Sequence, residues 1–200
     1  MSVEDSQKTW SELASSSLLL KAVASWRVDP QEWLESAFDR LPETVRVNPL
    51  RQDSEWVEQW LKSVGADRIG WFKGPGSAWE MPFARGSAEG EVRELLKSLH
   101  ETGRITRQEV VSMIPVLAMD ISPGETVLDM CASPGSKTTQ IAECLGDRGI
   151  VFANEISNSR ANTLVSNVQR HASRTTIVIN HDGRHIPKVP MEGFDKILVD

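Results

Sequence analysis

Apolar and polar positions follow two patterns along the second half of the chain, residues 124–200: short strand-like runs and longer helical stretches. Four short runs rich in valine, isoleucine and leucine have the length of buried strands: 126–130, 150–154, 176–179 and 196–199. Longer stretches at 137–145 and 157–171 follow the first two runs and have helical character. This alternation is typical of a parallel sheet whose strands are joined by right-handed helical crossovers, so we expect an α/β fold.

The first half of the chain has a different pattern, with separate amphipathic helices around a segment rich in glycine, proline and aromatic residues. Three helices are predicted: one after Asp29-Pro30, one from Asp53-Ser54 to Gly65, and one over 91–100. The apolar faces of the first two carry Trp33, Trp56 and Trp60, so we expect these rings to pack in a core. Between the second and third helices, residues 69–85 predict short strands and turns.

A further helix is predicted where the two patterns meet. Thr106 and Glu109 have the spacing of a capping box, and Pro115 must kink or reorganise the helix that follows. All 7 tryptophans lie between Trp10 and Trp79, which favours two domains. We therefore expect a smaller, helix-rich α+β module over residues 1–105 and an α/β domain that begins at residue 106.

Composition excludes several classes of protein. No apolar run approaches the length of a membrane span, and the polar, acidic N-terminus is no secretory signal. The 2 cysteines, Cys131 and Cys144, lack metal-type spacing and suit a reducing compartment, so we expect a cytoplasmic protein, or a nuclear one in a eukaryote, with no metal. The formal net charge is −6, and neither half of the chain is basic, which counts against simple electrostatic binding of nucleic acid.

The most informative motif is the segment Asp129–Thr138, Asp-Met-Cys-Ala-Ser-Pro-Gly-Ser-Lys-Thr. It joins a predicted strand to a predicted helix through small residues, which leaves backbone N–H groups free to bind an anionic or polar cofactor. Ser136 separates Gly135 from Lys137, so the segment is not a nucleoside-triphosphate loop. A single glycine also excludes the dinucleotide pattern.

This segment resembles the methionine-binding loop of the Nop/Sun family of RNA cytosine-5 methyltransferases, which use S-adenosylmethionine. Three further segments are similar to motifs of that family: 106–115, 180–187 and 194–200. Arg46-Val47-Asn48 is similar to a short R-x-N segment in the family's N-terminal module, and the detailed resemblance covers about Gly103 to Asp200. The residues of segments 112–115 and 180–182 resemble the tRNA-modifying branch of the family more closely.

The resemblance implies a Rossmann-like methyltransferase sheet, of which residues 106–200 would form only the first half. It also implies that the chain is the N-terminal part of an enzyme that methylates carbon 5 of cytosine in RNA, with tRNA as its expected partner. The module over residues 1–105 would contact RNA. Trp71 and Trp79, in the turn-rich segment, are weaker candidates for such contacts.

The resemblance assigns S-adenosylmethionine to residues at the ends of the predicted strands. These residues are Cys131, Ala132, Ser133, Pro134, Gly135, Ser136, Lys137, Glu155, Arg160, Asp182, Gly183 and Asp200. Lys137 would approach the methionine carboxylate, Glu155 the ribose hydroxyls and Asp182 the adenine amino group. Their alternatives are ordinary: Glu155 suits a solvated helix start, Arg160 a surface position and Asp182 an Asx turn.

Asp200 is the expected catalytic residue, because in the family this aspartate begins an Asp-x-Pro-Cys motif. Carbon 5 of cytosine becomes nucleophilic only after a thiolate adds to carbon 6, and a carboxyl group can protonate N3 of the adduct. The family's two cysteines for this chemistry follow Asp200, and Cys131 does not replace them because it lies in the cofactor loop. We therefore expect residues 1–200 to be inactive alone. Two other functions stay open: methylation of another substrate, or non-catalytic binding of RNA or S-adenosylmethionine.

Overall fold

A computed structural model describes residues 18–26, 29, 32–33, 36–37, 39–186 and 193–200. The chain divides into two compact units, Met1–Leu41 and Pro42–Asp200. The described part of the first unit includes the short helix α2 (Leu18–Val23), and the rings of Trp26 and Trp33 meet edge to face with centroids 5.9 Å apart. The helix predicted after Asp29 depends on Pro30, Leu34 and Phe38, which lie outside the described residues.

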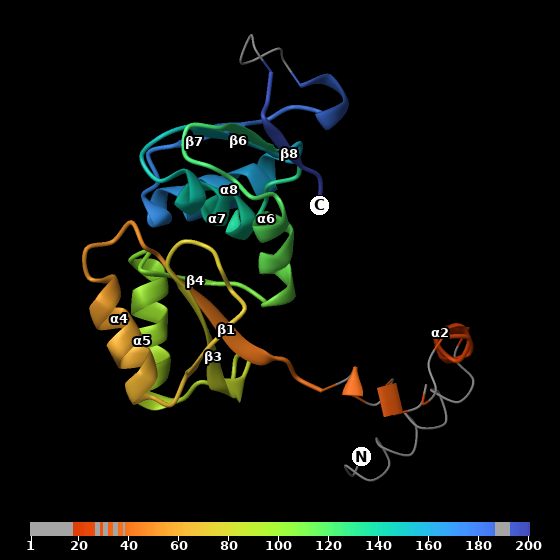
Figure 1. Cartoon of the computed structure of the whole chain (residues 1–200), viewed down its shortest axis with the longest axis vertical. Helices are drawn as coiled ribbons and strands as arrows, with labels where there is room; N and C mark the ends of the chain where they lie inside the picture. The colour runs from red at the N-terminus through yellow and green to blue at the C-terminus, as the bar shows by residue number, and fades with distance from the viewer. Residues whose placement is uncertain (1–17, 27–28, 30–31, 34–35, 38, 187–192) are drawn as a thin grey trace. The chain divides into compact units, whose positions relative to one another are not determined.

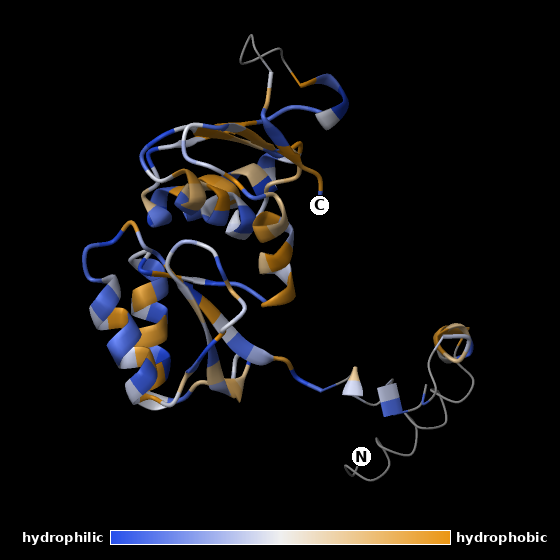
Figure 2. Cartoon of the chain, viewed as in Figure 1, coloured by the Kyte–Doolittle hydropathy of each residue, from blue (hydrophilic) through white to orange (hydrophobic). Residues whose placement is uncertain are grey.

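The second unit begins with an antiparallel sheet in the order β2-β3-β1-β4. Its strands are β1 (Pro42–Val47), β2 (Asp67–Arg68), β3 (Ser77–Ala84) and β4 (Ile105–Arg107). Helices α4 (Ser54–Ser63) and α5 (Gly90–Glu101) lie side by side on one face of this sheet, as Figure 1 shows. Both helices alternate apolar and polar residues (Figure 2), and their apolar sides close a core with Val45, Val47 and Trp79.

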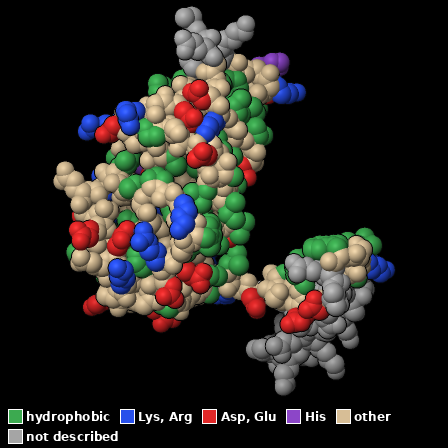
Figure 3. Space-filling view, viewed as in Figure 1, with side chains coloured by type: hydrophobic (Ala, Val, Ile, Leu, Met, Phe, Trp, Pro, Cys, Tyr) green, Lys and Arg blue, Asp and Glu red, His purple; other side chains and the backbone are tan. Residues whose placement is uncertain are grey.

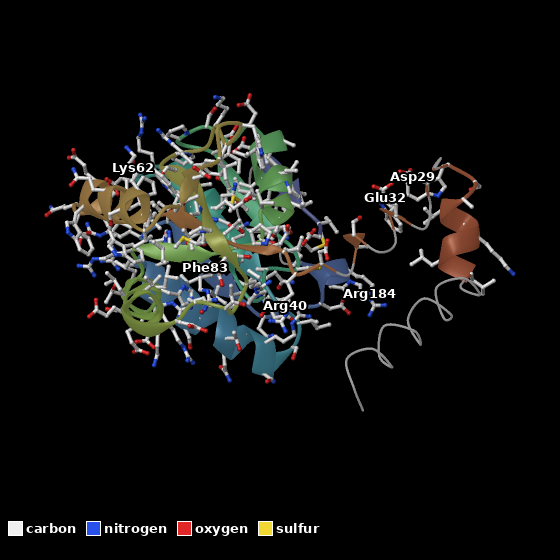
Figure 4. The ribbon with its side chains drawn as sticks, turned by 90° about the horizontal axis from the view of Figure 1, so that it is seen from below. Asp29, Glu32, Arg40, Lys62, Phe83 and Arg184 are labelled. Atoms are coloured by element: carbon white, nitrogen blue, oxygen red, sulfur yellow. The ribbon has the colours of Figure 1, made fainter. Side chains whose placement is uncertain are left out.

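Two tryptophans lie where the sequence patterns did not place them. Trp56 was expected in the core, but it is 49% exposed on α4, whose inward face is formed by Val57 and Leu61. Trp79 was a candidate for RNA contact, but it is 1% exposed, and its indole N–H donates to Ser77 Oγ over 2.7 Å. Lys62, labelled in Figure 4, places its ammonium 5.9 Å from the Trp79 ring centroid. Trp79 is therefore a core residue, whereas Trp71 is 48% exposed.

The helix predicted from Thr106 is wrong. Thr106 lies in β4 and pairs with Arg46 of β1, because an edge strand of the sheet outcompetes the local helical preference. The Glu109 carboxylate instead accepts hydrogen bonds from the backbone N–H groups of Val111 and Ser112, at 3.1 and 3.2 Å. A 3₁₀ turn (Val111–Met113) then leads into α6 (Ile114–Ala118), and Pro115 occupies the first turn of α6 instead of kinking a longer helix.

The second sheet is parallel and has the order β7-β6-β5-β8, which confirms the predicted α/β fold. Its strands are β5 (Thr126–Asp129), β6 (Ile150–Asn154), β7 (Thr176–Ile179) and β8 (Lys196–Leu198). Helices α7 (Ser136–Leu145) and α8 (Asn158–His171) lie on one face of the sheet (Figure 1). Val127 and Val151 pack against Ile141 and Leu145 of α7, so the crossover helix is fixed by burial.

Arg46 and Asn48 join the two sheets. Arg46 has a fully buried side chain, and its guanidinium contacts the Glu143 carboxylate of α7 at 2.6 and 3.0 Å. The Asn48 amide donates to the carbonyl oxygens of Gly103 and His171, at 2.8 and 3.2 Å, which ties the α5–β4 turn to the end of α8. The predicted boundary between residues 105 and 106 falls within β4, and it stays a prediction.

The surface of the second unit mixes charges of both signs. On the face drawn in Figure 3, acidic and basic side chains lie among one another, so neither sign dominates there. A net charge of −6 for the chain agrees with this mixture, and any anion would have to bind at a local cluster of basic groups. Within the described ranges, no helix has the length and apolar character needed to cross a membrane.

Candidate functional site

The loop between β5 and α7 forms one wall of the site. Gly135 takes the left-handed φ of 108° immediately before Ser136 begins α7, and a Cβ there would lie 2.9 Å from the Leu164 side chain. The left-handed φ therefore favours glycine, and a larger residue would also displace the Leu164 side chain. Lys137 extends from the first turn of α7 to Asp200 after β8, with Nζ 2.7 Å from Oδ2. The structure thus brings together two residues that were predicted separately.

Asp129, at the end of β5, is a buried acidic residue behind the loop that was not among the predicted site residues. Its buried carboxylate accepts a hydrogen bond of 2.6 Å from the Thr138 hydroxyl on α7. Burial raises the pKa of Asp129 to about 6, although the Thr138 hydrogen bond and the Lys137 charge act in the opposite direction. Such a shift is typical of functional sites, and an aspartate at a strand end was the available signal.

A cavity of about 310 Å³ lies at the carboxyl ends of β5, β6 and β7. This is where open parallel sheets bind their ligands, and the volume falls within the usual range for small-molecule sites. Met130 and Ile156 supply apolar surface, and Ile156 is 63% exposed. The polar lining includes Glu155, Arg160 and Asp182, so three predicted residues from two strand ends and α8 surround one space.

Glu155 is held in a fixed position at the end of β6. The residue is 3% exposed, and its carboxylate accepts the backbone N–H of Ser157 over 2.8 Å at the start of α8. Arg160 lies with Nε 3.4 Å from the same carboxylate and donates to the Ser133 carbonyl oxygen over 2.9 Å. Arg160 therefore connects the acidic strand end to the glycine loop, although its side chain is largely exposed.

Asp182 forms an Asx turn, the alternative to its predicted adenine contact. Its carboxylate accepts the backbone N–H of Arg184 over 3.0 Å, and the Arg184 guanidinium holds the pKa of Asp182 below its ordinary value. Arg184, labelled in Figure 4, lies in the same short turn (Gly183–His185). A Cβ on Gly183 would lie 3.1 Å from the Met130 side chain, so the backbone closely approaches that wall of the cavity. Asp182 forms this turn and also lines the cavity, so its carboxylate can contact a ligand without leaving the turn.

The predicted loop residues do not all face this cavity. Cys131 is exposed and lines it, whereas Ala132 and Ser133 are 5% and 9% exposed. Pro134, Gly135 and Ser136 line a second cavity on the other side of the loop. Their assignment to the cofactor stays a prediction, as does the catalytic role of Asp200.

The comparisons with known proteins agree on one family. The family profile described as "16S rRNA methyltransferase RsmB/F" matches residues 116–200. The chain is 33% identical over 172 residues to the 25S rRNA (cytosine-C(5))-methyltransferase nop2 of Schizosaccharomyces pombe, covering 84% of this chain and 27% of that protein. It is 31% identical over 173 residues to the tRNA (cytosine(49)-C(5))-methyltransferase of Pyrococcus abyssi, covering 86% of this chain and 53% of that one. The chain belongs to the Nop/Sun family.

A solved structure extends the comparison of this Nop/Sun chain to three dimensions. The crystal structure of a methyltransferase homolog protein from Pyrococcus horikoshii aligns with a TM-score of 0.68 at 28% identity, over 86% of this chain and 54% of that one. The fold is therefore the Rossmann-like fold of methyltransferases. A third relative, the multisite-specific tRNA:(cytosine-C(5))-methyltransferase of Saccharomyces cerevisiae, is 41% identical over 113 residues, covering 49% of this chain and 16% of that protein. The Nop/Sun chain thus spans about half or less of the length of these curated relatives.

The family's cofactor is S-adenosylmethionine, and the residues of the 310 Å³ cavity fit it. The fit rests on an exposed apolar wall at Ile156, a carboxylate fixed at Glu155 and the close backbone approach at Gly183. Apolar surface suits a purine ring, and a carboxylate at the end of the second strand suits ribose hydroxyls. Among the residues that the structure describes, no cluster of three or more His, Cys, Asp or Glu could hold a metal ion.

Proposed function

We propose that the full-length protein containing this Nop/Sun chain methylates carbon 5 of cytosine in RNA, with tRNA as its substrate. The observation that carries the proposal is the convergence of Cys131, Glu155 and Asp182 on one cavity at the ends of three adjacent parallel strands. Relatives named for cytosine-5 methylation of tRNA and rRNA support the reaction. Sequence segments 112–115 and 180–182 favour tRNA.

Bound S-adenosylmethionine supplies an electrophilic methyl group. The chain's own residues would hold and orient it: Glu155 would accept hydrogen bonds from the ribose, and Asp182 would accept one from the adenine amino group in exchange for part of its contact with Arg184. Lys137, in the first turn of α7, would approach the carboxylate of the ligand, where the helix dipole also favours an anion. Asp200 has a half-exposed side chain that pairs with Lys137, and we expect it to contact the incoming base.

Neither cysteine of this chain suits the addition to carbon 6 of cytosine. Burial raises the pKa of Cys144 to about 11, so this residue is a protonated thiol at neutral pH. Cys131 is exposed but lines the cofactor cavity, where its sulfur would face the methyl donor instead of the RNA. The nucleophile therefore belongs to the cysteine motifs that the family resemblance places after Asp200.

The Glu155→Ala and Asp182→Ala variants of the full-length protein are each expected to bind S-adenosylmethionine about 1–3 kcal/mol more weakly, because each leaves ligand hydrogen-bond donors without a partner. Calorimetric titration with S-adenosylmethionine or S-adenosylhomocysteine measures the change. Arg184→Ala is the matched control, since it removes the ion pair of Asp182 but keeps its carboxylate. Wild-type affinity in both alanine variants, or preference for ATP over either ligand, would contradict the cofactor site.

RNA that contains 5-azacytidine tests the reaction itself, because this base blocks release of the cysteine adduct. The full-length protein is expected to form a covalent band with such a tRNA in the presence of S-adenosylmethionine, whereas residues 1–200 alone form none. Cys131→Ser and Cys144→Ser in the full-length protein still give the band, as seen by denaturing electrophoresis. A band that disappears in Cys131→Ser would make the loop cysteine the nucleophile, and no band in any sample would refute methylation at carbon 5.

A further inference from the structure

A second cavity of about 520 Å³ lies between the antiparallel sheet and the parallel domain, outside the cofactor cavity. β4 and the end of α5 form one wall, and the end of α8 forms another. Pro134, Gly135 and Ser136 of the glycine loop close it. The two cavities share no lining residue, yet Cys131 lines the first and Pro134 the second. Three residues of chain span at most about 11 Å, so the two spaces are close neighbours.

Basic side chains outnumber acidic ones around this second cavity. Arg85, Arg107 and Arg170 line it, and Arg107 forms an ion pair with Glu43. Within the described part of the chain, Arg85 and Arg170 form no ion pair. Glu109 is the one acidic side chain in the lining, and its carboxylate already accepts two backbone N–H groups. The space is therefore positively charged in a chain that is acidic as a whole.

His100 reports the same positive field. Burial lowers the pKa of this histidine, and the charges of Arg170 and Arg107 lower it further. Burial disfavours a charge of either sign, whereas the two arginine charges disfavour a further cation and favour an anion. The ring also contacts the Ile105 carbonyl oxygen at 3.4 Å, which fixes it against β4.

His171 adds a buried polar atom that lacks a partner. The residue is 3% exposed and lines the cavity, with Nε2 2.9 Å from the Glu143 carboxylate. Its other ring nitrogen, Nδ1, is buried without a hydrogen bond within the described residues. Buried polar atoms are nearly always paired, so His171 places an unsatisfied polar group in the wall of the cavity. The positive end of α7 at Gly135 and Ser136 faces the same space.

We propose that this second cavity binds a phosphate group, and that in the substrate complex the group is a backbone phosphodiester of RNA. The second part rests on the function proposed above, since an RNA strand whose cytosine reaches the cofactor passes close to the neighbouring cavity. Arginine guanidinium groups, an imidazole and backbone N–H groups at a helix start are the groups that bind phosphate in proteins. The site fixes the position of the strand and contributes no sequence specificity.

Arg170→Gln in the full-length protein tests this site, with Arg174→Gln as the matched control. Arg174 is exposed just beyond α8 and does not line the cavity. Loss of one phosphate contact with single-stranded RNA is expected to reduce the slope of log affinity against log salt by about 0.7, and to weaken binding about fivefold at 0.1 M salt. Arg174→Gln keeps the wild-type slope. Binding of S-adenosylmethionine is measured on the same samples, and Arg85→Gln serves if Arg170→Gln does not fold.

Equal slopes for the cavity variant and the wild type would overturn the phosphate site, while intact cofactor binding would leave the proposed function standing. Failure of the wild type to bind RNA would overturn both. NMR signals of the His100 and His171 rings distinguish the source of the phosphate. We expect both inorganic phosphate and an RNA oligonucleotide to shift them in the wild type. Shifts with inorganic phosphate alone would overturn RNA as the ligand.

Discussion

Arg46→Ala is expected to lower the free energy of unfolding by about 3–5 kcal/mol, because it leaves the Glu143 carboxylate buried without its main counter-charge. Both side chains are fully buried, and they meet at 2.6 Å. Although burial alone would raise the pKa of Glu143, the Arg46 charge and hydrogen bonds from His171 and Arg46 hold it below its ordinary value. Glu143 therefore stays ionised at neutral pH, and removal of the arginine leaves this buried negative charge without its counter-charge. Urea unfolding at pH 7 measures the loss.

An exposed ion pair of the same chain provides the control. Lys97 and Glu101 lie one turn apart on α5 at 3.9 Å, with both side chains more than half exposed, so Lys97→Ala costs about 0.5 kcal/mol or less. The double variant Arg46→Met, Glu143→Leu removes both charges and is expected to be more stable than Arg46→Ala. If Arg46→Ala cost no more than Lys97→Ala, the buried pair would not be what holds the two sheets together.

Gly103→Ala is expected to lower the free energy of unfolding by about 3 kcal/mol, through a backbone clash and an unfavourable φ. Gly103 has φ +67°, and an added Cβ would lie 1.9 Å from the Arg170 carbonyl oxygen. The neighbouring chain cannot move away easily, because Arg51 donates to that same oxygen and Asn48 donates to Gly103. Thermal or urea unfolding reports the effect.

Gly86→Ala separates the two causes. Gly86 has a similar φ of +80°, but an added Cβ would have nothing within 4 Å. We expect the free energy of unfolding of this variant to fall only by the cost of the left-handed conformation, about 1 kcal/mol. Equal losses in the two variants would mean that the clash with the Arg170 carbonyl oxygen adds nothing to the cost of Gly103→Ala.

The parallel half of the fold could be predicted because its signals are local. Each strand is a short apolar run, and each helix begins at a small or polar residue, so β5 to β7 and their crossovers follow from neighbouring residues. The helix predicted from Thr106 failed because its segment pairs with β1, some 60 residues upstream. Local propensity carries no information about such a partner.

The site shows the same division. The glycine loop, Glu155 and Asp182 were predicted as separate strand ends, and parallel pairing brings Glu155 and Asp182 to one cavity. Asp129 was missed because its role depends on burial and on Thr138 across the turn. The R-x-N segment was noticed only as a resemblance, since the partners of Arg46 and Asn48 lie on α7 and at the end of α8. The second cavity has no sequence signal, because it is assembled from five separate stretches of the chain.

The separation of Arg46 from Glu143 also orders events during protein synthesis. The two residues are 97 positions apart, and ribosomes add about 5–20 residues per second, so the arginine emerges roughly 5–20 s before its carboxylate. During that interval the strands β1 to β4 can pair, but the Arg46 guanidinium has to remain in water because its burial without Glu143 is too costly. The antiparallel sheet can therefore form first, but its Arg46 side chain becomes buried only after α7 has formed.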